Sequence, residues 1–271
     1  MIAVLLVLLA LPTSGCCEAV WTVYDWGSKG NILKNPVLVQ HAPHGPRSEV
    51  VYRHSVEGTV VFEFRGGPGP AVLLTAGVHG DEVWTVIALL KLLDALSPTS
   101  VIGTVYVIPA VNPAGLAANS RLVDGVDPNR TADIPGSLTW HLVRFALSHR
   151  VKYWLDMHCG SGVPRQGALL TDEESEFVDE LARSSGFVPL VKSAPRGSIR
   201  SVARRFGIDV ITLEVPRDAG PSGVERAYHA ALAFLRLTGA LRRGQSRTPA
   251  SGSANVTVPV LPAIVPRRRL G

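Results

Sequence analysis

The chain has 271 residues, enough for one or two domains with a sizeable hydrophobic core. With 46% hydrophobic and 18% charged residues, it is not a chain that is disordered over most of its length. The formal net charge is +5, but three of these charges come from Arg267, Arg268 and Arg269. Basic residues do not form a stripe with interleaved aromatic residues, so the sequence predicts no nucleic-acid partner.

The amino-terminal stretch is apolar over residues 1–11 and is followed by a zone of small and polar residues up to residue 19. It is too short to span a membrane as a helix and is typical of a secretory signal. We therefore predict a signal peptide or membrane anchor over residues 1–19, with the protein exported or membrane-anchored. The alternative is an ordinary first strand in a cytoplasmic protein, because the stretch lacks an initial Lys or Arg.

Short apolar runs and amphipathic runs alternate along the rest of the chain. The apolar runs predict strands at residues 59–64, 71–76, 101–110, 151–157, 187–191 and 208–213. The other runs predict helices at residues 83–93, 138–146, 172–183, 199–206 and 222–237. Ser137, Ser198 and a capping box at residues 171–174 are the expected helix starts. Gly186 and Gly207 are the expected ends.

Strands that alternate with helices predict a single α/β domain over residues 20–241, with a largely parallel or mixed sheet flanked by helices. We expect the strands at 59–64 and 71–76 to form a hairpin, because a Gly- and Pro-rich turn joins them. Residues 114–133 are polar and irregular, and a loop of this length is usually functional or disordered. Residues 242–271 read as a Gly/Ser/Pro-rich linker with a short basic tail.

A histidine and a glutamate lie three residues apart in Gly77-Val78-His79-Gly80-Asp81-Glu82, between a predicted strand and a predicted helix. Such a turn at the carboxyl end of a strand is where α/β sheets bind ligands. His158 and Glu214 follow two further predicted strands. Two histidines and one glutamate, spaced as a close pair and a distant third ligand, are typical of a catalytic zinc site that keeps a position for water. We predict one Zn²⁺ per chain.

A zinc site of this kind needs a base, and Glu214 is the candidate because it ends an apolar run. The alternative interpretation pairs Glu214 with Arg217. Asp156 is expected on the same side of its strand as His158 and could orient the imidazole ring. The alternative is that Asp156 pairs with a nearby arginine.

The polar segment at residues 114–133 carries three candidate substrate contacts. Asn129 and Arg130 offer an amide and a planar guanidinium, which suit a substrate carboxylate. Arg121 could stabilise the oxyanion that forms when water adds to a carbonyl. Each of these arginines could instead be a solvated surface residue.

Five ordered motifs make the sequence resemble the succinylglutamate desuccinylase/aspartoacylase family, relatives of the zinc carboxypeptidases. The motifs are Gly77 to Glu82, Asn112-Pro113, Asp127-Pro128-Asn129-Arg130, Asp156-Met157-His158 and Thr212-Leu213-Glu214. The resemblance spans residues 72–228 and implies a single zinc-carboxypeptidase-like domain. We expect the carboxy-terminal β-domain of many members to be largely missing.

The resemblance also implies roles for single residues. The implied zinc ligands are His79, Glu82 and His158, with Glu214 as general base and acid, Arg121 as oxyanion donor, and Asn129 and Arg130 as carboxylate binders. The segment Arg200-Ser201-Val202-Ala203 is similar to a short family stretch whose arginine contacts the acyl-side carboxylate in aspartoacylases, so Arg200 joins the substrate-binding set. This sequence departs from the family in having Pro128 where leucine is common.

The first functional hypothesis is a zinc-dependent deacylase that hydrolyses the amide bond of an N-acyl amino acid. The second is a metallocarboxypeptidase acting on peptide C-termini, but such peptidases generally carry a Tyr before the catalytic Glu, and none lies between His158 and Glu214. The third is a non-catalytic, exported ligand-binding protein, which would not need Glu214. The sequence sets neither the acyl group nor the amino acid nor the oligomeric state, and it implies contact with a membrane only through the amino-terminal stretch.

Overall fold

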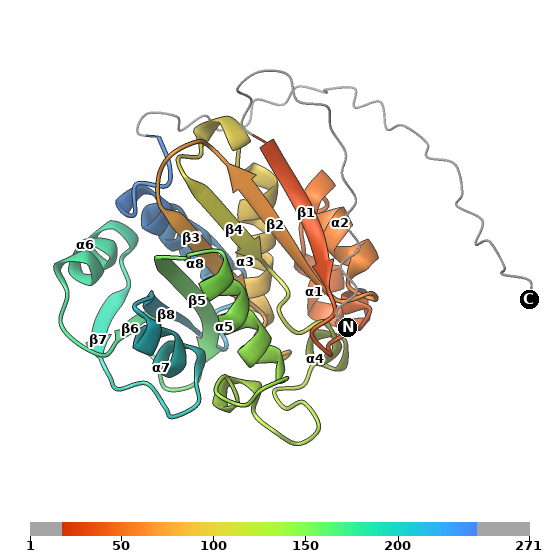
Figure 1. Ribbon diagram of the computed structural model, residues 1–271. Helices are drawn as coiled ribbons and strands as arrows, with labels where there is room; N and C mark the ends of the chain where they lie inside the picture. The colour runs from red at the N-terminus through yellow and green to blue at the C-terminus, as the bar shows by residue number, and fades with distance from the viewer. Residues whose placement is uncertain (1–17, 243–271) are drawn as a thin grey trace, which may run out of the picture.

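The computed structural model describes residues 18–242 (Figure 1). The predicted signal peptide or anchor lies outside the described residues except for Glu18 and Ala19, which belong to the first strand. The predicted linker and tail also lie outside them, apart from Arg242. Within residues 18–242 the helices are all too short or too polar to cross a membrane.

Eight strands form one mixed sheet in the order β1-β2-β4-β3-β5-β8-β6-β7. They are β1 (Glu18–Tyr24), β2 (Thr59–Arg65), β3 (Ala71–Ala76), β4 (Thr104–Ile108), β5 (Tyr153–Gly160), β6 (Ala168–Thr171), β7 (Val188–Val191) and β8 (Asp209–Pro216). The central strands β4, β3, β5 and β8 are parallel, and β2 and β6 join them in antiparallel orientation. The predicted mixed α/β fold is confirmed.

The hairpin predicted between β2 and β3 is wrong, because β4 lies between the two strands. The turn that joins β2 to β3 crosses the start of β4 instead of closing a strand pair. Gly66 N donates to the carbonyl oxygen of Gly103 at 2.8 Å, and Thr104 N donates to that of Pro70 at 2.9 Å. The backbone of the turn is therefore satisfied by the chain that leads into β4, which comes much later in the sequence.

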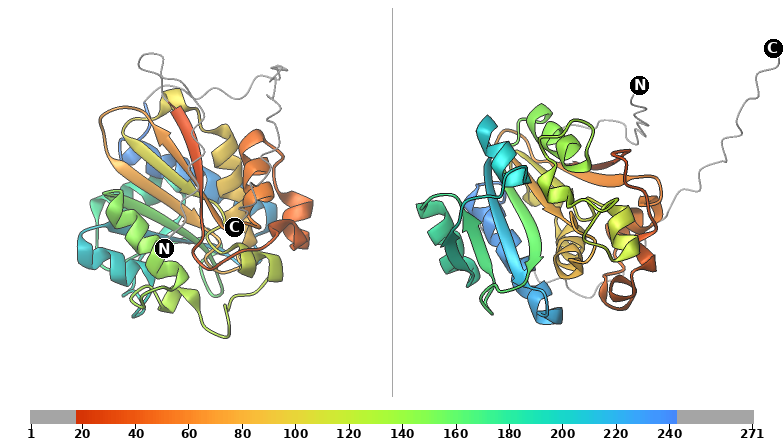
Figure 2. Two further views of the ribbon diagram at one scale, coloured as in Figure 1. Left: turned by 45° about the vertical axis from the view of Figure 1, so that its right-hand side comes forward. Right: turned by 90° about the horizontal axis from the view of Figure 1, so that it is seen from below.

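Helices cover both faces of the sheet (Figure 2). They are α1 (Pro36–His41), α2 (Pro46–His54), α3 (Val83–Ala95), α4 (Pro113–Ala118), α5 (Leu138–Ser148), α6 (Glu176–Ser185), α7 (Ile199–Ala203) and α8 (Gly220–Leu237). Four 3-10 turns, η1 to η4, occupy Ile32–Lys34, Pro98–Ser100, Pro128–Arg130 and Arg204–Phe206. The larger hydrophobic core includes residues of α1, α2, α3, α6 and α8, and a second core includes residues of α5 and α7.

Only some of the predicted helix starts are confirmed. The hydroxyl oxygens of Ser137 and Ser198 cap α5 and α7, as predicted. The capping box predicted at residues 171–174 is wrong, because Thr171 is the last residue of β6 and α6 begins after Ser175. Strand β6 pairs with β7 and β8, and this pairing determines the conformation where the helix start was predicted. The segment at residues 114–133, predicted to be irregular, starts within the regular helix α4.

Alternation along β5 separates core residues from site residues. Leu155 and Met157 point into the larger core, so Asp156 and His158 point to the opposite face of the sheet. In the parallel register of β5 and β8, His158 lies directly beside Glu214. The site therefore forms on the α5 and α7 face, at the carboxyl ends of the central strands.

The turn between β3 and α3 packs tightly against α4, and Gly80 makes this possible. A Cβ atom at Gly80 would lie 1.9 Å from the carbonyl carbon and oxygen of Gly115. We expect Gly80→Ala to lower the free energy of unfolding by about 2–3 kcal/mol, because the turn and α4 must move apart. Urea unfolding measures this change. An unchanged unfolding midpoint would contradict the close packing.

Candidate active site

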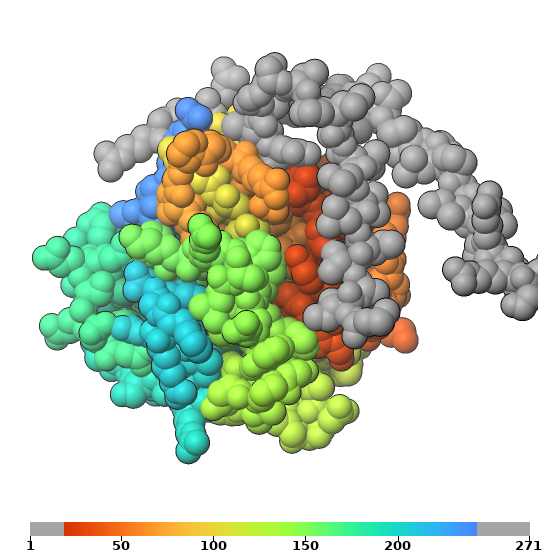
Figure 3. Space-filling view, viewed as in Figure 1, coloured from red at the N-terminus to blue at the C-terminus, as the bar shows by residue number. Residues whose placement is uncertain are grey.

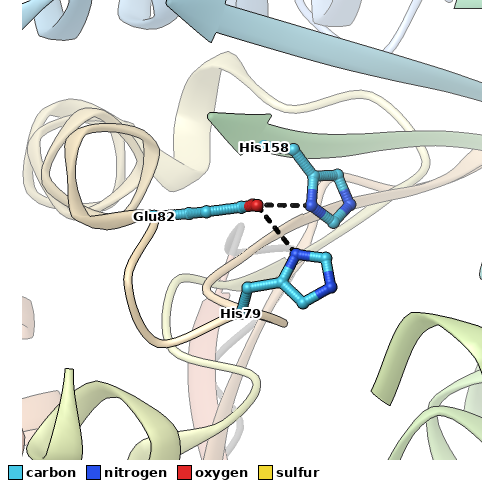
Figure 4. Close-up of side chains that lie close together, drawn as sticks. All are labelled: His79, Glu82 and His158. Carbon is cyan, nitrogen blue, oxygen red and sulfur yellow. Dashed lines mark hydrogen bonds and ion pairs between the residues drawn. The ribbon is translucent and has the colours of Figure 1, made fainter. Parts of the chain in front are cut away.

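Two histidines and one glutamate meet at the carboxyl ends of β3 and β5. Glu82 Oε1 lies 2.8 Å from His79 Nδ1, and Glu82 Oε2 lies 2.8 Å from His158 Nδ1 (Figure 4). All three side chains are buried, and one ligand atom from each lies within 4.8 Å of the others. The residues predicted from the sequence as metal ligands are thus brought together around one point.

Each imidazole ring also contacts the carboxylate of an aspartate through its Nε2 atom. His79 Nε2 lies 2.9 Å from Asp127 Oδ1, and His158 Nε2 lies 2.8 Å from Asp156 Oδ2. A carboxylate at Nε2 keeps the ring proton there and leaves the Nδ1 lone pair for a metal ion. The contact of Asp156 was expected from its position in the strand. The contact between Asp127 and His79 was not predicted, although Asp127 belongs to the same motif as Asn129.

This donor set suits a metal ion. Two imidazole nitrogens and one carboxylate oxygen match the protein ligands of catalytic zinc sites, which keep one position open. Three carboxylates, those of Glu82, Asp127 and Asp156, surround the two rings, and a divalent cation would offset their negative charge. Burial raises the pKa of the neighbouring Cys159 thiol to about 12, so this residue remains a protonated thiol.

The same carboxylates raise the pKa of the two histidines. Burial alone would lower the pKa of His79, but hydrogen bonds to Asp127 and Glu82 raise it. Burial opposes the charges of Asp156 and Glu82 at His158 too, and the carboxylates raise its pKa well above the usual value. Because a metal ion binds the neutral imidazole, protons compete for this site as the pH falls.

Glu214 lines the same cavity as the metal-ligand candidates and forms no ion pair within residues 18–242. Its Oε2 atom is buried and accepts no hydrogen bond from the described residues. Burial raises the pKa of Glu214 to about 7; the charge of His158 lowers it and that of Glu82 raises it. The ion pair with Arg217 considered above does not form, since Arg217 donates to Asp81 instead. A carboxylate with a pKa near neutrality can both accept and donate a proton.

Arg121 reaches the ligand cluster from the chain that follows α4. Its Nη1 donates to Glu82 Oε1 at 3.1 Å, and its Nη2 donates to Asp127 Oδ2 at 2.9 Å. The Arg121 side chain is 37% exposed, so it lies on the solvent side of the cluster. This position suits a donor to an oxygen atom held near the metal-ligand candidates.

The three predicted substrate-binding residues lie along α7 and η3. Asn129 Oδ1 accepts a hydrogen bond from Ile199 N at 2.8 Å, and Arg130 is exposed. Arg200 is only 4% exposed, and its Nη2 donates to the carbonyl oxygen of Lys192 at 2.8 Å. Its Nη1 makes no hydrogen bond within residues 18–242 and lies 3.7 Å from Asp172 Oδ1.

These residues line one cavity of about 370 Å³, hereafter the catalytic cavity. Its wall includes the metal-ligand candidates, Glu214, and the basic side chains Arg121, Arg130, Lys192, Arg200 and Arg217. Helices α5 and α7 pack side by side over this face of the sheet (Figure 3). The excess of basic side chains favours an anionic ligand.

The sequence pattern of the succinylglutamate desuccinylase/aspartoacylase catalytic domain matches residues 68–237, which confirms the predicted resemblance. A curated relative, the N-alpha-acetyl-L-2,4-diaminobutyric acid deacetylase of Halomonas elongata, is 36% identical over 101 residues. That match covers 35% of this chain and 30% of the relative, so the chain spans less than a third of the relative's length.

Solved structures give the same fold. The succinylglutamate desuccinylase/aspartoacylase from Rhodobacter sphaeroides is 27% identical, with a TM-score of 0.57 over 72% of this chain and 63% of that one. The murein-tripeptide amidase of Escherichia coli O157 is 21% identical, with a TM-score of 0.55 over 68% of this chain and 88% of that one. At that identity the second likeness concerns the fold alone. The predicted zinc-carboxypeptidase-like fold is confirmed.

Removal of one ligand candidate tests the metal site. We expect His158→Ala to bind at least tenfold less zinc than the wild type, because two of three protein ligands cannot hold the ion tightly. Zinc per chain is measured by elemental analysis after dialysis against a weak chelator. His229→Ala, which removes an exposed histidine, is the matched control. Equal zinc content in all three proteins would exclude His158 as a ligand.

The raised pKa of Glu214 has a consequence for stability. Below about pH 4.5 the carboxyl is protonated in both folded and unfolded chains, whereas above pH 7 the folded state must bury a charge. In chelator-treated protein, Glu214→Gln should therefore raise the free energy of unfolding at pH 8 by about 3 kcal/mol and leave it nearly unchanged at pH 4.

Urea unfolding at the two pH values measures this difference. Glu174→Gln, a change at an exposed glutamate, is the control and should have little effect at either pH. A Glu214→Gln variant that is no more stable than the wild type at pH 8 would show that the buried charge is compensated.

Proposed function

Because the chain belongs to the succinylglutamate desuccinylase/aspartoacylase catalytic-domain family, we propose that it is a zinc-dependent hydrolase that cleaves the amide bond of an N-acyl amino acid. The observation that carries the proposal is the buried Oε2 atom of Glu214, which accepts no hydrogen bond from residues 18–242, beside three convergent metal-ligand candidates. The Halomonas relative, a deacetylase by its printed name, supports the reaction class.

The ligand residues and Glu214 divide the chemistry between them. Bound by His79, Glu82 and His158, zinc would supply a Lewis acid for the scissile carbonyl and for the attacking water. Glu214 accepts a proton from that water and returns it to the nitrogen of the leaving amine. Asp156 holds the Nε2 proton of His158, so that Nδ1 keeps its direction throughout.

The arginines and Asn129 bind the substrate. Arg121 donates to the oxygen that becomes negative when water adds to the carbonyl, and its bond to Asp127 holds the guanidinium in place. Arg130 and the amide of Asn129 bind the carboxylate of the amino acid. Arg200, whose Nη1 makes no hydrogen bond within residues 18–242, offers one more donor to the substrate.

The proposal is tested by amine release from N-acyl amino acids and short peptides, with the zinc-loaded protein. We expect N-acyl amino acids to be hydrolysed, and Glu214→Gln to lower kcat by about 10²- to 10⁴-fold while zinc content stays at the wild-type level. Wild-type rates in this variant would exclude Glu214 as the base.

The same panel separates the other two hypotheses. Release of amino acids only from peptide C-termini would indicate a metallocarboxypeptidase. A zinc-loaded protein that hydrolyses none of these compounds would favour the non-catalytic ligand-binding protein.

A further inference from the structure

Two buried residues of the sheet, Thr75 on β3 and Trp154 on β5, lie behind the metal-ligand candidates. Thr75 is the direct partner of Asp156 in the parallel register of the two strands. Trp154 precedes Asp156 and His158 at alternate positions of β5, so these three side chains point to one face of the sheet. Both Thr75 and Trp154 are fully buried, yet neither lines the catalytic cavity.

Hydrogen bonds join these residues in a row that ends at a ligand candidate. Trp154 Nε1 lies 2.8 Å from Thr75 Oγ1, and Thr75 Oγ1 lies 2.7 Å from Asp156 Oδ1. The second oxygen of Asp156, Oδ2, lies 2.8 Å from His158 Nε2. We call these four residues the His158 network. It connects the second hydrophobic core, to which Trp154 belongs, with the imidazole ring.

The indole group determines the direction of the hydrogen bonds in the His158 network. An indole nitrogen can only donate, so the Thr75 oxygen accepts from Trp154 and its single proton goes to Asp156. The carboxylate of Asp156 then accepts at both oxygens, the second time from His158 Nε2. The Nδ1 lone pair of His158 is consequently left on the side of Glu82, where the ligand candidates converge.

The other imidazole ring is held differently. Asp127, which contacts His79 Nε2, follows α4 and is 19% exposed in its side chain. Its oxygens accept from Asn129 N at 2.8 Å and from Arg121 Nη2 at 2.9 Å. The direction of His79 thus depends on the segment that carries the substrate contacts, whereas that of His158 depends on the sheet alone.

We propose that Thr75 and Trp154 are positioning residues for the metal site. They fix the carboxylate of Asp156, and through it the direction of His158 Nδ1. A ring that is already held in its binding orientation loses less conformational freedom when the ion binds, so the affinity for the ion is higher. This inference rests on the metal site of the proposed function and is independent of the reaction.

A purely structural role for the Thr75 hydroxyl is the alternative. The hydroxyl would serve only to satisfy the buried indole N–H, and its loss would lower the stability of the fold without changing the metal site. Thr59 provides the matched comparison within the same sheet. Its hydroxyl is also buried and donates to the carbonyl oxygen of Val111 at 2.9 Å, and Thr59 does not line the catalytic cavity.

Zinc affinity, measured on the full chain by competition with a chromogenic chelator, separates the two roles. Thr75→Val keeps the shape of the side chain and removes the hydroxyl. We expect it to bind zinc about tenfold or more weakly, as for other changes behind a metal-bound histidine. Thr75→Ser retains the hydroxyl and should stay within about twofold of the wild type. Thr59→Val should bind zinc as the wild type does.

Trp154→Phe removes the indole N–H and leaves the hydroxyl of Thr75 able to donate to Asp156. We expect a smaller loss of zinc affinity, about threefold, because the hydroxyl loses only the partner that sets its direction. A larger loss in Trp154→Phe than in Thr75→Val would show that packing of the indole positions the site, which would overturn the role of the hydroxyl.

Nitrogen NMR of the zinc-loaded wild type tests the same geometry without a substitution in the sheet. His158 should carry its proton on Nε2 and the ion on Nδ1. An ion on Nε2 would overturn the inference even if Thr75→Val failed to fold.

The zinc measurements also separate this inference from the proposed function. Wild-type affinity in Thr75→Val, or an equal loss in Thr75→Val and Thr59→Val, would overturn the positioning role while the metal site stands. A wild-type protein that binds no zinc would reject the positioning role and the proposed function together.

Discussion

The carboxylate of Glu82, shared between two imidazole rings, is the interaction around which the site is organised. Each of its oxygens lies 2.8 Å from the Nδ1 atom of a histidine, and each histidine is held at Nε2 by an aspartate. The buried carboxylates of Glu82 and Asp156 and the half-buried one of Asp127 are costly to bring together without compensating positive charge. Arg121 supplies part of that charge from the solvent side, and a divalent metal ion would supply the rest.

The sheet brings these groups together by simple geometry. His79 and Glu82 follow β3, His158 ends the neighbouring parallel strand β5, and Glu214 lies beside His158 on β8. Alternation along the strands directs the chemical groups to the α7 face while the residues between them fill the larger core. Glu214 is consequently beside the metal-ligand candidates, and its buried Oε2 accepts no hydrogen bond from residues 18–242. Burial of this carboxylate raises its pKa.

Features set by local sequence were predictable. The strand at residues 71–76 and the serine caps of α5 and α7 appear as the sequence indicates, because short-range patterns determine them. The position of β4 between β2 and β3 was missed, because strand order depends on contacts between distant segments. Arg217 shows the same limit within the site. Although it is only three residues from Glu214, Arg217 lies beyond the end of β8 and pairs with Asp81, which follows β3.

The most direct test of this account is X-ray absorption spectroscopy of the zinc-loaded protein, which reports the atoms that surround the ion. Two imidazole nitrogens and a carboxylate oxygen, with a further light-atom ligand, are the predicted shell, at distances of about 2.0–2.2 Å. The spectrum of His79→Ala should have lost one imidazole. A sulfur ligand at about 2.3 Å, or a shell without imidazole, would contradict the central claim that His79, Glu82 and His158 hold the metal.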